Sequence, residues 1–251
     1  MPRPLILVTN DDGIRAPGIG ALAEALQPLG DVRVYAPESQ QSAVGHGVSL
    51  HKPLRASQIE SDWWAIDGTP TDCVMLAVRA LLGQRPDLVV SGVNDGPNLG
   101  DDVTYSGTVA GAYEGMLLGL PALAVSMARY GHAYLETGAA VAARMAAHVL
   151  EHGLPEQVAY SINVPAVPYD ELRGLRFTRM GRRHYEDDVI ERFDPRGRRY
   201  YWIGGSEPSH EAAPGTDFEA IEAGMVSVTP LIRDLTDYAA LEQIHDHQVA
   251  L

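Results

Sequence analysis

Two adjacent carboxylates follow the first apolar run of the chain. Asp11 and Asp12 stand in the segment Thr9-Asn10-Asp11-Asp12-Gly13, directly after Leu5-Ile6-Leu7-Val8. An apolar run that ends in a turn signal predicts a buried strand, and open α/β sheets bind ligands at the carboxyl ends of their strands. Adjacent carboxylates near buried surface repel each other and lose hydration, and a bound cation offsets both costs. A solvated Asp-Asp-Gly turn explains these residues about equally well when they are taken alone.

Two further loops follow predicted strands and offer oxygen ligands. One covers residues 37–42 and contains Ser42; the other covers residues 92–100 and contains Asn94 and Asn98. The carboxyl ends of parallel strands meet at one edge of a sheet, so all three loops can lie together. Carboxylate, hydroxyl and amide oxygens suit Mg²⁺ or Mn²⁺ rather than zinc. For residues 92–100 alone, a turn that needs glycine for positive φ is at least as good an explanation.

A predicted helix begins next to these loops. Ser106, Gly107 and Thr108 open it, and Ser or Thr at such a position is usually a cap. The same helix start presents free backbone N–H groups and the positive end of the helix dipole, which suit a phosphate group. A cation site beside a phosphate site predicts a phosphoryl-transfer centre, although neither loop establishes it alone.

Composition excludes several classes of function. The formal net charge is −14, with 33 acidic against 19 basic residues. Phosphate backbones and anionic lipid surfaces would be repelled, so we expect neither a nucleic-acid polymer nor a membrane as partner. A small phosphorylated substrate remains compatible if a metal supplies local positive charge. Cys73 is the single cysteine, no apolar run approaches roughly 20 residues, and no signal-peptide pattern opens the chain, so a reduced cytoplasm is expected.

Strand-like and helix-like segments alternate over the first two-thirds of the chain. This alternation predicts an α/β fold with a Rossmann-like, mostly parallel sheet flanked by helices. We expect a catalytic core over residues 1–165 and a C-terminal extension over 166–251. The predicted strands are 5–9, 31–36, 87–91, 122–127, 158–164 and 227–231, and the predicted helices are 19–26, one opened by the Thr69 cap, 107–118, 135–152 and 238–248.

The extension carries a predicted β-hairpin. Residues 189–193 and 199–203 flank the turn Asp194-Pro195-Arg196-Gly197. Its aromatic residues favour pairing with another subunit, and a hairpin lying on the surface of the same subunit has about equal weight.

For three other motifs, a structural role is favoured over a functional one. Gly18-Ile19-Gly20-Ala21-Leu22-Ala23 formally fits a dinucleotide fingerprint, but it follows two aspartates and Pro17, so we expect a packed helix. Cys73 and Arg79 have the spacing of a cysteine phosphatase loop, but the intervening residues are apolar and helical, which predicts a core cysteine. For His46, a polar loop residue is favoured over a proton-transfer role.

Taken together, the motifs resemble the survival protein SurE family of metal-dependent 5′/3′-nucleotidases. The ordered blocks span residues 5–236, which is most of the chain. They are Asn10-Asp11-Asp12-Gly13, Ala36-Pro37-Glu38 with Ser42, Gly68-Thr69-Pro70-Thr71-Asp72-Cys73, Ser91-Gly92-Val93-Asn94 with Gly96, Asn98 and Gly100, Tyr105-Ser106-Gly107-Thr108-Val109, Pro214-Gly215-Thr216-Asp217, and Thr229-Pro230-Leu231.

The resemblance implies a site and an assembly. It maps one divalent cation, Mg²⁺ or Mn²⁺, onto Asp11, Asp12, Ser42 and Asn94. It also implies hydrolysis of nucleoside 5′- and 3′-monophosphates, with short-chain polyphosphate as a substrate of some members. The C-terminal extension is expected to form a homodimer or homotetramer, partly by exchange of elements.

We therefore hypothesise metal-assisted hydrolysis. The expected catalytic residues are Asp11, Asp12, Asn94 and Ser106, and the expected phosphate-binding residues are Asn98, Ser106, Gly107 and Thr108. The sequence does not identify the aspartate that accepts the proton from water. The alternative hypothesis is a non-catalytic nucleotide or metal sensor that uses the same site.

Overall fold

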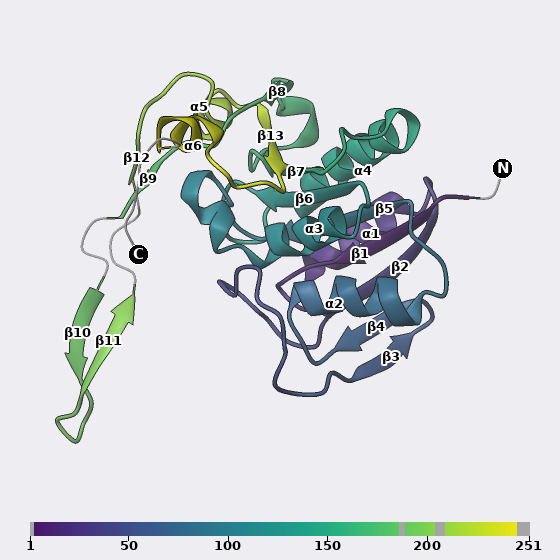
Figure 1. Ribbon diagram of the computed structural model, residues 1–251, viewed down its shortest axis with the longest axis horizontal. Helices are drawn as coiled ribbons and strands as arrows, with labels where there is room; N and C mark the ends of the chain where they lie inside the picture. Colours follow the sequence, from purple (N-terminus) through teal and green to yellow (C-terminus); the bar gives the residue numbers. More distant parts are fainter. Residues whose placement is uncertain (1–2, 186–188, 204–208, 245–251) are drawn as a thin grey trace.

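A sheet of nine strands organises the described part of the chain, which comprises residues 3–185, 189–203 and 209–244 of a computed structural model (Figure 1). The strand order is β3-β4-β2-β1-β5-β6-β7-β13-β8. The strands are β1 (Leu5–Thr9), β2 (Asp31–Pro37), β3 (Ala56–Glu60), β4 (Trp63–Ile66), β5 (Leu88–Asn94), β6 (Ala122–Met127), β7 (Val158–Val164), β8 (Leu175–Phe177) and β13 (Val226–Ile232).

The centre of this sheet is parallel, as the sequence predicts. β1 pairs in parallel with β2 on one side and with β5 on the other. The chain continues from β1 to β2 on one side and returns to β5 on the other side, so the carboxyl ends of β1 and β5 form a topological switch point, where open α/β sheets bind ligands. β13 runs antiparallel to β7, and β3 runs antiparallel to β4, so the outer part of the sheet is mixed.

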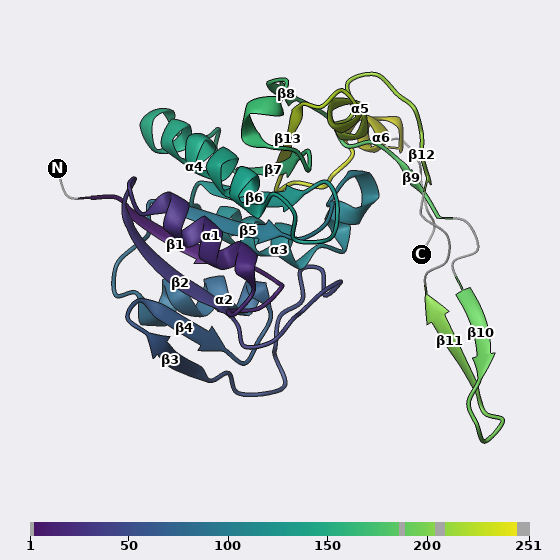
Figure 2. The ribbon, with the colours of Figure 1, turned by 180° about the vertical axis from the view of Figure 1, so that it is seen from behind.

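Helices cover both faces of the sheet. α2 (Pro70–Leu76) and α3 (Gly107–Leu117) lie in front in Figure 1, and α1 (Pro17–Leu26) and α4 (Leu135–His152) lie in front in Figure 2. Side chains alternate along β1 accordingly, since Ile6 and Val8 join the cluster with α1 and α4, while Leu7 joins the cluster with α2 and α3. This two-sided burial explains why β1 is a continuous apolar run.

Local sequence rules account for the helix that begins at Pro70. The Thr69 side chain accepts a hydrogen bond from the Asp72 N–H, and the Asp72 side chain accepts one from the Thr69 N–H. This reciprocal pair is a capping box, and Pro70 fills the first helical position. A single π-helical turn, Ala77–Leu81, continues the helix.

The C-terminal residues complete the sheet and form several small elements. β13 and β8 lie at one edge of the sheet, and the two-residue strands β9 (Arg183–His184) and β12 (Ser209–His210) pair beside α5 (Asp217–Glu222). The predicted hairpin is β10 (Val189–Phe193) with β11 (Arg199–Ile203), and it projects away from the sheet in Figures 1 and 2. The predicted last helix is α6 (Tyr238–Ile244), and positions 245–248 of that prediction lie outside the described residues.

Within the described ranges, none of the helices combines the length and the apolar character needed to cross a bilayer.

Candidate metal and phosphate site

Asp11 lies buried at the end of β1 and contacts two other site loops. Its side chain is 5% exposed, and its carboxylate accepts a hydrogen bond from the Thr108 hydroxyl in the first turn of α3. Its backbone carbonyl accepts a hydrogen bond of 2.7 Å from the Gln41 N–H. The residue that precedes Ser42 is therefore hydrogen-bonded to the backbone of Asp11.

Asp12 and Asn94 come together through Asp95. The Asp95 N–H donates to the Asp12 Oδ2 at 3.3 Å, which places the loop after β5 beside the loop after β1. The Asn94 amide Nδ2 donates to the Gly96 carbonyl at 2.9 Å. That hydrogen bond orients the amide through its nitrogen and leaves the Oδ1 as the group that can bind a cation.

Ser42 is exposed, on a loop that two other elements hold in place. Its hydroxyl accepts a hydrogen bond of 2.9 Å from the Gln40 Nε2. Further along the loop, the Ser49 N–H donates to Asp72 at 2.9 Å, and the Gly45 N–H donates to the Tyr105 carbonyl at 3.0 Å. The capping box of α2 therefore also anchors the loop that carries Ser42.

The start of α3 touches Asp11 because residue 107 has no side chain. A Cβ placed on Gly107 would lie 2.7 Å from the Asp11 Cβ and 2.9 Å from its Oδ2, closer than such atoms approach. The Ser106 hydroxyl accepts a hydrogen bond of 3.0 Å from the Val109 N–H, which makes it the helix cap. The Thr108 hydroxyl is engaged with Asp11, so the groups that this helix start offers to an anion are backbone N–H groups and the hydroxyl hydrogen of Ser106.

Asn98 forms its hydrogen bonds with residues outside this cluster. Its Nδ2 donates to the Ser126 hydroxyl at 2.8 Å, and its backbone exchanges two hydrogen bonds of 2.9 Å with the Asn163 side chain. These bonds fix the 7% exposed residue to the ends of β6 and β7. In the part of the chain that the structure describes, no hydrogen bond joins Asn98 to Asp11, Asn94 or Ser106.

Burial makes the two carboxylates electrostatically unfavourable on their own. The pKa of Asp11 is raised from 3.8 to about 6: desolvation is the main cause, the Thr108 hydrogen bond opposes it, and the Asp12 charge adds to it. Desolvation also raises the pKa of Asp12, and the negative charge of Asp95 adds to this effect. None of the ion pairs among the described residues involves Asp11 or Asp12.

The donor set fits a hard divalent cation. Two carboxylates outside the described ion pairs, one amide oxygen and one hydroxyl are oxygen ligands of the kind that Mg²⁺ and Mn²⁺ bind. Across residues 3–185, 189–203 and 209–244, no group of three or more His, Cys, Asp or Glu side chains forms a metal cluster. Oxygen donors of this kind suit Mg²⁺ or Mn²⁺ better than zinc, which favours nitrogen and sulfur ligands.

Asp95 is a residue that sequence reasoning missed. Its carboxylate accepts hydrogen bonds from the Gly131 and His132 N–H groups, and its Oδ2 lies 3.0 Å from the His132 Nδ1. The sequence indicated that Asp95 belongs to the loop 92–100 but predicted no role for it. Its partners lie 36 and 37 positions away, so no local pattern predicts them.

The weaker motifs have structural roles. Cys73 is fully buried in α2, where burial raises the pKa of its thiol, as expected of a core cysteine. Gly18 is buried in α1, and a Cβ there would lie 2.1 Å from the Val93 carbonyl oxygen, so this glycine permits close helix packing. The Nε2 of His46 lies 3.0 Å from the Oε2 of buried Glu114 in α3.

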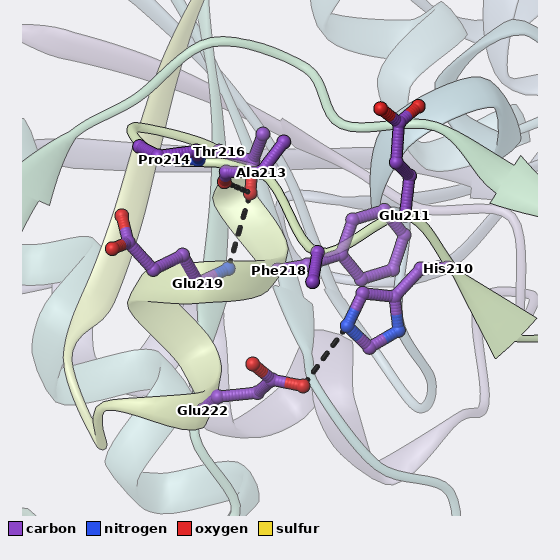
Figure 3. Close-up of a pocket in the computed structure, with 9 residues that line it drawn as sticks. His210, Glu211, Ala213, Pro214, Thr216, Phe218, Glu219 and Glu222 are labelled. Carbon is purple, nitrogen blue, oxygen red and sulfur yellow. Dashed lines mark hydrogen bonds and ion pairs between the residues drawn. The ribbon is translucent and has the colours of Figure 1, made fainter.

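A cavity of about 260 Å³ lies between β12 and α5 (Figure 3). The His210 ring stacks on the Phe218 ring with centroids 4.3 Å apart, and the His210 Nε2 lies 2.9 Å from Glu222. Its lining contains none of the predicted metal or phosphate residues.

The fold and the site together define an α/β protein with two adjacent aspartates, Asp11 and Asp12, at the switch point of a mostly parallel sheet, next to a helix N-terminus. The family model of the survival protein SurE matches residues 6–187, and the chain belongs to this family. A Geobacter sulfurreducens protein named 5′-nucleotidase SurE is 55% identical over 237 residues, which cover 94% of this chain and 90% of the relative.

Two further comparisons agree. A 5′-nucleotidase SurE of Methylococcus capsulatus is 50% identical over 239 residues, with 95% of each chain covered. The crystal structure of the SurE protein from Aquifex aeolicus superposes with a TM-score of 0.86 at 43% identity, covering 96% of this chain and 98% of that one. The predicted α/β fold is therefore confirmed.

Proposed function

We propose that this chain is a metal-dependent 5′-nucleotidase that releases phosphate from nucleoside monophosphates. The names of the Geobacter and Methylococcus relatives support the reaction class. The observation that carries the proposal is the buried Asp11 carboxylate, which has no basic partner among the described ion pairs and touches the N-terminus of α3. This contact brings a cation-binding carboxylate and an anion-binding helix start together.

Asp11, Asp12, Ser42 and Asn94 would hold the cation. A bound divalent cation lowers the pKa of water and polarises a phosphate oxygen. Asp11 and Asp12 supply two negative charges, while Asn94 and Ser42 supply neutral oxygens, so the group as a whole keeps affinity for an anionic substrate. The hydrogen bonds from Thr108 to Asp11 and from Asp95 to Asp12 would orient the carboxylates.

The start of α3 would hold the phosphoryl oxygens. The backbone N–H groups of Gly107 and Thr108 and the hydroxyl hydrogen of Ser106 are donors that stabilise charge developing on the phosphoryl group. Asn98 would complete this set. Because its Nδ2 already donates to Ser126, we expect it to contribute less to phosphate binding than the start of α3 does. An aspartate of the pair would accept the proton from the attacking water.

The finer activities follow from the same chemistry. The site recognises a terminal phosphate through a cation and backbone donors, neither of which requires a particular ester position. Hydrolysis of nucleoside 3′-monophosphates and of short polyphosphate chains is therefore part of the proposal.

The β10–β11 hairpin supports an oligomer. Phe193, Trp202 and Ile203 are 61%, 64% and 89% exposed, and the register places Trp202 on the opposite face of the hairpin from Phe193 and Ile203. Large apolar side chains exposed on both faces favour burial against another molecule. We propose that a second copy of the chain covers the hairpin in a homodimer or homotetramer.

Phosphate release tests the catalytic proposal. Wild-type protein is mixed with AMP, 3′-AMP and tripolyphosphate in the presence of Mn²⁺ or Mg²⁺, and then with EDTA. We expect release that EDTA abolishes and that Asp11→Asn reduces at least roughly 100-fold, while circular dichroism shows an intact fold. Saturable AMP and Mn²⁺ binding without turnover would instead indicate a sensor, and near-normal activity of Asp11→Asn would reject the assigned site.

A further inference from the structure

Tyr130 is an exposed aromatic residue at the edge of the candidate site, on the loop between β6 and α4. Its side chain is 73% exposed. Its ring occupies the space that a side chain at residue 96 would fill, because a Cβ on Gly96 would lie 2.2 Å from the Tyr130 Cε1 and 2.6 Å from its Cδ1. Gly96 has a φ of +150°, a conformation suited to glycine. The ring is thus seated on the loop that carries Asn94 and still presents most of its surface to solvent.

Hydrogen bonds of Asp95 connect the Tyr130 loop to the candidate metal site. Its Oδ1 accepts hydrogen bonds of 3.1 Å and 2.7 Å from the N–H groups of Gly131 and His132. The same residue donates its own N–H to Asp12 at 3.3 Å. A single residue therefore links the loop that follows Tyr130 to a proposed metal ligand, which fixes the position of the ring relative to the candidate metal site.

The hydroxyl end of Tyr130 lies in the acidic surroundings of the site. Partial desolvation raises its pKa, the negative charges of Asp102, Asp95 and Asp11 raise it further, and Arg183 lowers it. Asp11 is thus close enough to influence the hydroxyl. The hydroxyl stays protonated at neutral pH, so the side chain is a neutral aromatic surface beside a charged site.

We propose that Tyr130 is the stacking surface for the base of the nucleotide substrate. This inference rests on the proposed nucleotidase function. A nucleoside monophosphate needs a contact for its base once its phosphate is held at the cation and at α3, and an aromatic ring accepts any base because every base has a π face. The ring contacts the base and not the reacting atoms, so it affects substrate binding rather than the chemical step.

Paired substrates separate this role from a structural one. AMP and ribose 5-phosphate carry the same phosphate and sugar, but only AMP carries a base. In Tyr130→Ala we expect the KM for AMP to rise roughly tenfold through lost stacking, with little change in kcat. The kinetic constants for ribose 5-phosphate should stay within about twofold of wild type, since that substrate has no base to stack.

Two further variants complete the design. Tyr130→Phe keeps the ring and should keep the wild-type KM for AMP. Tyr169→Ala removes another exposed tyrosine, in the C-terminal extension, and should leave both substrates unaffected. Equal losses for AMP and ribose 5-phosphate in Tyr130→Ala would show that the ring only supports the loop, and an unchanged KM for AMP would also overturn the proposal.

Equilibrium binding keeps this proposal distinct from the catalytic one. Calorimetric titrations with AMP and with inorganic phosphate, both in Mn²⁺, do not require turnover. We expect Tyr130→Ala to weaken AMP binding roughly tenfold and to leave phosphate binding unchanged. If wild-type protein releases no phosphate, the catalytic proposal fails while this difference still decides the role of Tyr130; wild-type protein that binds phosphate no more weakly than AMP would overturn the stacking proposal alone.

Discussion

The Asp11 carboxylate accepts a hydrogen bond from the Thr108 hydroxyl, and this contact joins the first strand to a helix 97 positions further along the chain. The helix reaches the carboxylate because Gly107, beside Thr108, has no Cβ to separate them. The sequence predicts Asp11 as a cation ligand and Thr108 as a phosphate-binding residue. In the structure they form one hydrogen-bonded unit.

Removing that hydroxyl should weaken metal binding. In Thr108→Val the shape is nearly kept but the hydrogen bond to Asp11 is lost, so the carboxylate is no longer oriented. We expect Mn²⁺ affinity to fall roughly 10- to 100-fold in a calorimetric titration, as for other partners of metal ligands. Thr108→Ser keeps the hydroxyl and should bind Mn²⁺ nearly as wild type does. Unchanged affinity in Thr108→Val would remove Thr108 from the supporting role.

The raised pKa of Asp11 predicts a pH dependence of stability without metal. The folded state binds the proton of this carboxyl more tightly, with a pKa of about 6 against 3.8 in the unfolded chain. The free energy of unfolding should therefore fall as pH rises from about 4 to 6, by about 3 kcal/mol from this residue. Urea melts in EDTA measure it, and Asp11→Asn should lose this part of the pH dependence and be more stable than wild type above pH 6.

A matched exposed residue serves as the control for the pH experiment. Asp170→Asn lies at an exposed position and should leave the pH profile of wild type unchanged.

Added Mn²⁺ should raise the melting temperature more at pH 8 than at pH 5, since only the ionised carboxylate is a good ligand. An equal rise at both pH values would argue against Asp11 as a ligand.

Two glycine substitutions should have opposite effects. Gly107→Ala places a Cβ 2.7 Å from the Asp11 Cβ, so α3 must move away from the site. We expect it to lose most phosphate release and to lower the melting temperature. Gly20→Ala in α1 has no heavy atom within 4 Å of the new Cβ and should stabilise the protein by up to about 1 kcal/mol with normal activity. Similar activity in both variants would contradict the close approach at Gly107.

Charge on the hairpin should reduce the size of the assembly. Trp202→Glu places a carboxylate in the surface that we propose a second copy covers, and burying an unpaired charge there is unfavourable. Light scattering after size-exclusion chromatography should give a smaller mass for this variant than for wild type. Ile59→Glu changes an exposed residue of β3 and should leave the mass unchanged. A monomeric wild type would reject the oligomer outright.

Sequence periodicity predicted the elements that form the centre of the sheet. β1, β6 and β7 have the predicted bounds because strands buried on both faces are apolar throughout. The starts of α2 and α3 were predictable because caps are local, with Thr69 and Ser106 each bonding three positions ahead. The βα alternation predicted a mostly parallel sheet with helices on both faces, but it did not predict the order of the strands.

Other elements lacked a local signal. β3 and β4 were not predicted; β3 is an exposed edge strand with little apolar alternation, so only its pairing with β4 defines it. The links through Asp95 also depend on partners far away in the sequence. The sequence could gather the loops that carry Asp11, Ser42 and Asn94 at one edge, but not the hydrogen bonds that connect them.

One carboxylate in the C-terminal extension is hydrogen-bonded both to the core and to another segment of the extension. The Oδ2 of Asp217 accepts a hydrogen bond of 2.7 Å from the Gly100 N–H, and its Oδ1 accepts one of 2.8 Å from the Gly181 N–H. Gly100 lies in the segment that leads into α3, and Gly181 lies between β8 and β9 in the extension. Neither amide can exchange its hydrogen with solvent unless the Asp217 contact opens, so the two segments should report the same opening event in hydrogen-exchange measurements.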